Sequence, residues 1–241
     1  MLASVRLEEK SAARCAVTSW RDRLYLAWTG YDTHINLAWS ADGREVTGKR
    51  RLAQRSGLFH PKGTVVLPPA LAGSGARLWL AWRGVHSLAS SSVNVCDAEH
   101  PDHPRPGTLA ERITESPALA ATGSGDAAVA WTGAGGRVCR LTVAEDPPGQ
   151  SLRMGSKSRF DIARSGRSPA ACCHQDRLIL AWTGTDRHIN LLTVAAADEP
   201  GAPVRLEQAR TSSAPALCIH QGRLILAWTG TDRHINLASV P

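Results

Sequence analysis

Three short turns in the sequence carry the same set of polar side chains, an aspartate, a histidine and an asparagine in the spacing Asp-x-His-x-Asn. Each set follows a Trp-Thr-Gly tripeptide. Carboxylate, imidazole and amide groups can form several hydrogen bonds to a hydroxylated ligand, and an adjacent indole offers an apolar face to a ring. The candidate ligand-binding residues are therefore Trp28, Asp32, His34, Asn36, Trp182, Asp186, Arg187, His188, Asn190, Trp228, Asp232, Arg233, His234 and Asn236.

The same residues also have structural alternatives, which the sequence leaves open. An aspartate in a turn often accepts hydrogen bonds from its own backbone. The histidines can bond a neighbouring strand, and the tryptophans can belong to a core. Two further Trp-x-Gly segments, at 82–84 and 131–133, lack the aspartate. Because these segments otherwise resemble the first three, the fold does not require the aspartate, which favours a ligand role for it.

Catalytic and metal-binding patterns are weak, and the catalytic residues remain unknown. An Asp-His pair such as Asp186 and His188 can serve as a general base, but no nucleophile motif accompanies it. The segments expected to be inner strands contain no Asp or Glu, which argues against a glycosidase with paired inner carboxylates. The Pro-rich loop 99–103 holds two histidines without the fixed geometry of a metal site. We therefore expect no metal and no cofactor.

One phrase, typified by Arg-Leu-Ile-Leu-Ala-Trp-Thr-Gly, recurs five times along the chain. Its tryptophans are separated by 54, 49, 51 and 46 residues, a period typical of one four-stranded propeller blade. The phrase is apolar on both faces of an extended strand, as expected for a strand buried between packed sheets. The five tryptophans are Trp28, Trp82, Trp131, Trp182 and Trp228.

These repeats predict an all-β, five-bladed β-propeller with four-stranded antiparallel blades. We expect one domain over residues 1–241, with blades at about 12–56, 64–115, 116–167, 168–212, and 213–241 plus 1–11. The N-terminal segment 4–9 matches 203–208, so it is predicted to close the last blade as its fourth strand. A closed ring makes the three Asp-x-His-x-Asn turns neighbours in one arc, on the face that also carries the connections between blades.

Glycine and cysteine add two local expectations. The glycine after each Trp-Thr pair, such as Gly30 and Gly184, is expected to adopt a positive φ in a tight turn. Cys172 and Cys218 occupy the same place in two repeats, among small apolar residues, and are expected to be buried free thiols.

The repeat RLxLAWTGTDxxIN resembles that of bacterial five-bladed propellers with tandem tryptophan repeats, and more loosely the tachylectin-2 type of lectin. This resemblance implies a propeller fold and the binding of N-acetylated sugars at equivalent sites on several blades, but no sugar-contacting residue can be matched one by one. The predicted function is a carbohydrate-binding, lectin-like propeller. Two alternatives are an enzyme acting on a small molecule through an Asp/His pocket on the same face, and a protein-interaction scaffold.

Composition limits the partners. The net charge is +7, yet the arginines are scattered and aromatic residues make up only 5% of the chain, which argues against nucleic-acid binding. No apolar run is long enough for a membrane span, and the N-terminus resembles no signal peptide. We expect a glycan or small-molecule ligand, no nucleic acid, an undetermined oligomeric state, and a cytoplasmic location or export without a recognisable signal peptide.

Overall fold

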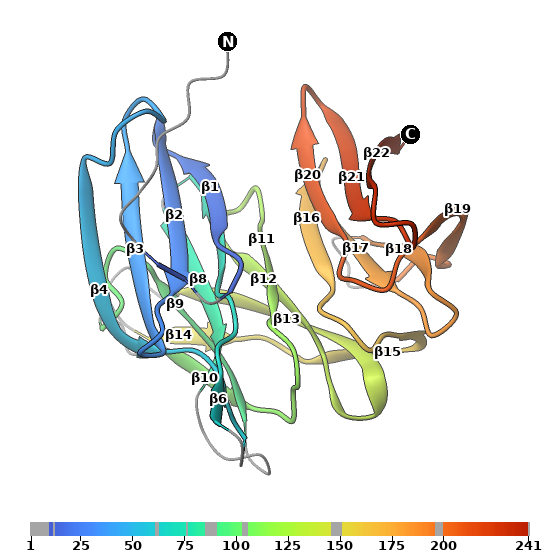
Figure 1. The fold of residues 1–241 in the computed structure, drawn as a ribbon, viewed down its shortest axis with the longest axis horizontal. Helices are drawn as coiled ribbons and strands as arrows, with labels where there is room; N and C mark the ends of the chain where they lie inside the picture. The colour runs from blue at the N-terminus through green and yellow to red at the C-terminus, as the bar shows by residue number, and fades with distance from the viewer. Residues whose placement is uncertain are drawn as a thin grey trace. The chain divides into compact units, whose positions relative to one another are not determined.

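The computed structural model describes residues 10–11, 13–60, 63–75, 77–84, 91–102, 106–145, 151–195 and 200–240. Over these residues β-strands account for nearly all regular structure, together with one short 3-10 turn at Ala134–Gly136. The strands form antiparallel sheets (Figure 1), and the fold is an all-β propeller in which one such sheet makes up each of five blades. The predicted fold class is therefore confirmed.

The first two blades have four strands each, hydrogen-bonded in the orders β1-β2-β3-β4 and β10-β9-β8-β7, and a two-stranded hairpin lies between them in the sequence. Their bounds are β1 (Ala16–Trp20), β2 (Arg23–Thr29), β3 (His34–Ser40), β4 (Gly48–Arg55), the hairpin strands β5 (Leu58–His60) and β6 (Gly63–Val65), β7 (Ala70–Ser74), β8 (Arg77–Arg83), β9 (Ser92–Asp97) and β10 (Gly107–Ala110).

The third blade has the order β11-β12-β13-β14 with β15 also paired to β13, the fourth has β16-β17-β18-β19, and the fifth has β20-β21-β22. Their bounds are β11 (Ala118–Ala121), β12 (Ala127–Thr132), β13 (Arg137–Glu145), β14 (Leu152–Met154), β15 (Ser158–Arg164), β16 (Ala170–His174), β17 (Arg177–Thr183), β18 (His188–Val194), β19 (Val204–Arg210), β20 (Ala216–His220), β21 (Arg223–Thr229) and β22 (Ile235–Val240).

Tight hairpins set the register of the first two strands in several blades. In blade 4 the loop between β16 and β17 is only Gln175-Asp176, and His174 pairs with Arg177. Both loop residues have positive φ, 49° and 56°. Two consecutive positive φ angles are what a type I′ turn requires, and this turn matches the twist of the strands it joins.

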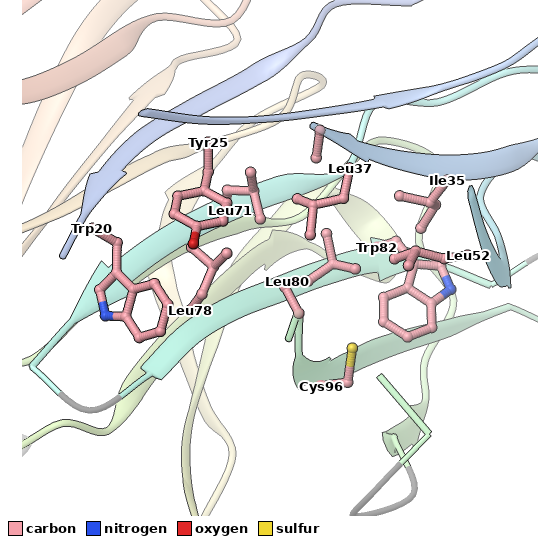
Figure 2. Packing of buried hydrophobic residues seen from close by; sticks show 12 residues of the cluster. Trp20, Tyr25, Ile35, Leu37, Leu52, Leu71, Leu78, Leu80, Trp82 and Cys96 are labelled. Atoms are coloured by element: carbon pink, nitrogen blue, oxygen red, sulfur yellow. The ribbon is translucent and has the colours of Figure 1, made fainter. Parts of the chain in front are cut away.

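The chain divides into two compact units, one of residues 1–112 with 145–153, the other of residues 113–144 with 154–241. In the first unit, the facing sheets of blades 1 and 2 share a buried hydrophobic cluster (Figure 2). Leu37 of β3 and Leu80 of β8 point toward one another across it, and Trp20 and Tyr25 meet edge to face with ring centroids 5.7 Å apart. Side chains on both sides of the interface therefore hold these two blades together.

The second unit contains two such interfaces. Blades 3 and 4 enclose a cluster that includes Val138, Phe160, Leu180 and Trp182. Another cluster, which includes the fully buried Leu226, lies between blades 4 and 5. The central strand β17 contributes to both, because its residues Leu178 to Thr183 are all buried. The two-sided apolar strand predicted from the repeat is therefore confirmed.

Blade 5 has three strands among the described residues. The segment 4–9, predicted to be its fourth strand, lies outside the described residues, so the closure of this blade stays a prediction. Over the part of the chain that the structure describes, no helix is long and apolar enough to cross a membrane.

The cysteines differ from the sequence expectation at one position. Cys218 is exposed and Cys172 is half-buried, whereas Cys96 and Cys139 are buried. The expectation of a fully buried thiol at the shared position in blades 4 and 5 is therefore wrong, because most residues of the first strand β16 are only half-buried and most of those of β20 are exposed.

Candidate functional site

The Thr-Gly turns lie beside the segments that lead from one blade into the next. The hydroxyl of Thr29 donates a hydrogen bond to the carbonyl of Leu67, at 2.7 Å, just before β7 begins. Thr183 makes the equivalent bond to the carbonyl of Ser213, at 2.6 Å, just before β20. The turns between second and third strands therefore share an edge of the sheet with the connections, as expected from the repeat.

The aspartate of each motif organises its own turn. One carboxylate oxygen of Asp32 accepts a hydrogen bond from the backbone N–H of His34, at 3.1 Å. Asp186 and Asp232 accept the same bond, also at 3.1 Å, from the backbone two residues on. This is the arrangement of an Asx turn. Oδ1 of each aspartate therefore has the turn-stabilising role that the sequence left open, while Oδ2 remains available for other partners.

The glycine of the motif provides space rather than an unusual backbone angle. None of the described glycines at this position has a positive φ, so that expectation is wrong; the positive angles fall three residues later, at Thr33, Arg187 and Arg233. A Cβ atom on Gly184 would lie 2.7 Å from Asp186 Oδ1 and 2.8 Å from Asn190 Nδ2. Glycine is needed because these two side chains fold back over it.

In blade 1 an arginine from the fourth strand completes the group. Arg51 on β4 donates to Asp32 Oδ2 from Nη2 at 2.7 Å and from Nε at 3.1 Å. His34 Nδ1 lies 3.2 Å from the same oxygen and 2.8 Å from Arg51 Nη2. Arg55, further along β4, reaches the other ring nitrogen of His34 at 3.1 Å. The imidazole is thus held on both sides.

Blade 4 repeats this arrangement. Arg205 on β19 lies 3.3 Å from Asp186 Oδ2 through Nε, and its Nη2 lies 2.9 Å from His188 Nδ1. His188 Nδ1 is 3.2 Å from Asp186 Oδ2. The register is the same in both blades, since Asn36 pairs with Arg51 and Asn190 with Arg205. We call these two groups the Asp-His-Arg clusters: Asp32, His34 and Arg51 in blade 1, and Asp186, His188 and Arg205 in blade 4.

Exposure separates the members of each cluster into two kinds. The side chains of Asp32 and Arg51 are 50% and 54% exposed, and those of Asp186 and Arg205 are 47% and 46% exposed. The histidine side chains are only 11% and 9% exposed. The histidines therefore act as buried supports, while the carboxylate and the guanidinium face solvent.

Electrostatics keep the carboxylates ionised. The hydrogen bonds from the Arg51 side chain are the main reason that the pKa of Asp32 is lowered. For Asp186 the largest cause of the lowered pKa is the hydrogen bond from the backbone of His188, with the charge of Arg205 adding to it. Each cluster therefore presents a fixed negative charge beside a fixed positive one.

Blade 5 carries the first two members without the third among the described residues. Asp232 Oδ2 lies 3.1 Å from His234 Nδ1, and both side chains are open to solvent, at 67% and 82% exposed. The arginine of the other blades comes from a fourth strand, and the segment predicted for that place in blade 5 lies outside the described residues.

Other sequence candidates have structural roles in the turn. The side-chain amide of Asn36 donates to the carbonyl of His34 at 3.2 Å, and Asn190 and Asn236 do the same at 3.1 and 3.0 Å. Arg187 and Arg233 occupy the turn position with φ of 68° and 71°, with exposed side chains. The asparagines therefore stiffen the strand start, and the arginines stand at the outer edge of the turn.

The tryptophans are largely withdrawn from solvent. Trp28 is 4% exposed and Trp182 is 2% exposed, and Trp182 belongs to the core between blades 3 and 4. Trp228 is half-buried. Rings this deeply covered have no free face for a sugar in this arrangement, so the polar residues carry the candidate site.

Two residues of the clusters, Arg51 and Arg205, were not among those predicted from the sequence. Both lie seventeen residues after the histidine of their blade, and this constant interval is the signal that could have found them. It is easily overlooked, because Arg51 belongs to the run Lys49-Arg50-Arg51, which is typical of a solvated strand face, although the segment Arg-Leu-x-Gln recurs at 51–54 and 205–208.

Comparisons with known proteins bear on the fold. No protein-family model matches the chain, and no curated protein matches it. Among solved structures, the fucose-specific lectin from Aleuria aurantia is similar with a TM-score of 0.61 at 11% identity, over 94% of this chain and 74% of that one. A GH43_1 enzyme from Xanthomonas citri gives 0.53 at 15% identity, over 94% and 86%.

A GH43 β-xylosidase/α-arabinofuranosidase from a compost microbial metagenome gives a TM-score of 0.55 at 9% identity, over 94% of this chain and 90% of that one. Identities this low show a shared fold and nothing finer. The chain therefore has the propeller fold that is found in a sugar-binding lectin and in glycoside hydrolases.

Proposed function

We propose that this propeller is a carbohydrate-binding module with repeated weak sites, each built on an Asp-His-Arg cluster. The observation that carries the proposal is the recurrence of this cluster in blades 1 and 4, in one register, with the carboxylate and guanidinium half-exposed in both. An ionised carboxylate accepts hydrogen bonds from sugar hydroxyls, and the guanidinium fork donates to hydroxyl oxygens.

The pairing within the cluster favours a neutral, hydroxylated ligand. Asp32 and Arg51 neutralise each other, so neither a strong anion nor a cation gains a large attraction there. Two vicinal hydroxyls, by contrast, offer one donor and one acceptor at adjacent positions. A single exposed site of this kind is weak, and several on one molecule gain avidity on a surface that carries many glycans.

A glycan array followed by titration calorimetry with the best free sugar tests the proposal. The variants Asp32→Ala and Asp186→Ala should each reduce array binding. The fold loss in the double variant should exceed the product of the fold losses in the two single variants. Asp42→Ala is the matched control, because Asp42 also caps a turn in blade 1, through hydrogen bonds from Arg44 and Glu45, but belongs to no cluster.

A folded protein that binds no sugar at millimolar concentration would overturn the proposal. So would sugar binding that the double variant leaves unchanged. In either case the clusters would be turn-stabilising devices only.

The runner-up is an enzyme that acts on a small molecule, favoured by the contact between His188 Nδ1 and Asp186 Oδ2, which has the geometry of an oriented general base. It predicts one dominant histidine. Turnover of a chromogenic sugar derivative that is lost in His188→Gln but kept in His34→Gln would select the enzyme, whereas graded loss of binding without turnover selects the module.

A further inference from the structure

Blade 3 departs from the other blades at three places, and the three departures meet at one cavity. The cavity has a volume of about 320 Å³ and lies in the second unit, between the facing sides of blades 3 and 4. The Asp-His-Arg clusters play no part in its lining, which includes Ala128, Arg140 and Thr142 from blade 3 and Cys173 and Asp176 from blade 4.

The first departure is a small residue on the second strand. Ala128 of β12 pairs with Thr142. The residue in this register position is Tyr25 in blade 1, Trp79 in blade 2, Ile179 in blade 4 and Ile225 in blade 5. Four blades fill the position with a large side chain. Blade 3 leaves it open, and the missing volume contributes to the cavity.

The second departure is a charged residue in a core position. Arg140 of β13 pairs with Ala130. In each of the other blades an alanine occupies the position of Ala130, and its partner on the third strand is apolar: Leu37, Val95, Leu191 or Leu237. Arg140 is 3% exposed and donates a hydrogen bond from Nη1 to the Thr142 hydroxyl at 3.3 Å. Burying a guanidinium costs free energy that a leucine would not cost, and it places a hydrogen-bond donor where the other blades have an apolar side chain.

The third departure is a longer hairpin loop. Residues 122–126 join β11 to β12, whereas the equivalent loop in blade 4 has only two residues, Gln175 and Asp176. The longer loop brings Thr122, Ser124 and Asp126 to the cavity. It also approaches blade 4, since a Cβ atom on Gly123 would lie 2.6 Å from Asp176 Oδ1. The loop and the blade 4 turn thereby bound one end of the cavity.

We propose that this cavity is a second binding site, for a neutral, polyhydroxylated small molecule of about the size of one or two sugar rings. Asp126 and Asp176 supply acceptors, Arg140 and the threonine and serine hydroxyls supply donors, and Leu178 with Val194 supplies an apolar floor. Two carboxylates against one guanidinium disfavour an anion. The volume lies at the lower end of the range typical of small-molecule pockets.

Cys173 provides a reporter for the site that works with any ligand, because its thiol lines the cavity. Burial raises the pKa of Cys173 to about 11, so alkylation is slow and is best followed at pH 9 by peptide mass spectrometry. The probes are galactose, mannose, fucose, xylose, N-acetylglucosamine, sucrose and myo-inositol, with glucuronate as an anionic control. Cys15, which is exposed, serves as the internal reference.

We expect at least one neutral probe to slow the alkylation of Cys173 severalfold at millimolar concentration while leaving Cys15 unaffected. Asp176→Asn should weaken that protection about tenfold or more, because a charged acceptor is lost. The matched control is Asp22→Asn, since Asp22 occupies the same turn position in blade 1, with φ of 57° against 56° for Asp176.

A gain-of-packing variant provides an independent arm. Ala128→Ile gives blade 3 the residue that blade 4 carries, so it should abolish protection while maintaining or raising the melting temperature. The proposal fails if no probe protects Cys173, if glucuronate protects best, or if Asp176→Asn behaves like Asp22→Asn. Failure here leaves the clusters in blades 1 and 4 untouched, because Asp32→Ala and Asp186→Ala report on those alone.

Discussion

Arg51 on β4 donates two hydrogen bonds to a single carboxylate oxygen of Asp32, Oδ2, in the turn that leads into the neighbouring strand β3. The other oxygen of Asp32 is engaged by the turn backbone. A single carboxylate therefore joins the second-to-third-strand turn to the fourth strand. This geometry makes the charge of Asp32 relevant to stability as well as to the proposed binding.

The charge contribution should depend on pH. Because the folded-state pKa of Asp32 and of Asp186 is lowered, each carboxylate stabilises the fold above its unfolded pKa, and this stability is lost as pH falls through the lower folded value. Asp32→Asn keeps the Asx turn and removes the charge, which should cost roughly 0.2–1 kcal/mol at pH 7 for so exposed a pair. Thermal unfolding of the unaltered protein and of Asp32→Asn at pH 7, 5 and 3 should show that their difference in stability disappears below about pH 4. A difference in stability that grows on acidification contradicts this account.

Gly184 should not tolerate a methyl group. Gly184→Ala places a Cβ within 2.8 Å of both Asp186 Oδ1 and Asn190 Nδ2, and we expect a loss of about 1–3 kcal/mol in the free energy of unfolding, measured by denaturant titration. Gly166→Ala is the control, since nothing lies within 4 Å of its added Cβ. If the clash with Asp186 is the cause, adding Asp186→Ala to Gly184→Ala should recover part of the lost stability. If the stability losses of the two single variants simply add in the double variant, the clash is not the cause.

The Thr183 hydroxyl should contribute to stability through its bond to the Ser213 carbonyl. Thr183 is buried, and Thr183→Val keeps its shape while removing the donor. We expect a loss of about 1 kcal/mol in chemical denaturation. Thr193→Val is the comparison, because Thr193 is exposed on β18 and its replacement should change stability by less than about 0.5 kcal/mol. Equal effects of the two substitutions would refute the role assigned to this bond.

Thiol reactivity should follow burial. Cys15 and Cys218 are exposed, while burial raises the pKa of Cys172 to about 12 and that of Cys96 well above its ordinary range. Iodoacetamide at pH 8, followed by peptide mass spectrometry, should modify Cys15 and Cys218 first and Cys96 last. Early modification of Cys96 in the folded protein would show that the first unit opens more readily than its packing implies.

The edge of blade 5 leads to a prediction about the N-terminal segment. Ile235 and Leu237 of β22 are 78% and 73% exposed, whereas their counterparts in blade 4, Ile189 and Leu191, are 0% and 8% exposed. The sequence Val5-Arg6-Leu7-Glu8 repeats Val204-Arg205-Leu206-Glu207. We expect it to pair with β22 and to place Arg6 against Asp232 and His234.

Hydrogen–deuterium exchange on the full chain tests this pairing. Arg6→Glu should accelerate exchange over residues 235–240, and adding Asp232→Arg should restore part of the protection. Arg44→Glu, an exposed arginine in the loop between β3 and β4, is the control. Fast exchange over 235–240 in the unaltered protein would contradict the pairing.

The sequence sufficed for features that repeat and failed where blades differ. Trp28 and Trp182 recur with a two-sided apolar strand, so the blades and their second strands were predictable. Fourth strands carry a weaker shared pattern: β4 (GKRRLAQR) and β19 (VRLEQAR) have only the short segment Arg-Leu-x-Gln in common. The partner of Asp32 was therefore missed, although its charge was visible. The role of Gly184 was missed for another reason, since space around a missing Cβ depends on how Asp186 and Asn190 fold, which sequence spacing does not encode.

The bond between Thr29 and Leu67 has a consequence for how the chain matures. The acceptor, Leu67, lies in the segment that leads into the following blade. During synthesis, the turn that carries Thr29 therefore cannot form this hydrogen bond until the start of the next blade has left the ribosome. Assembly should thus lag synthesis by about one connection. A chain truncated directly after the fourth strand of a blade would lack the acceptor of this hydrogen bond, and its last blade would be less stable.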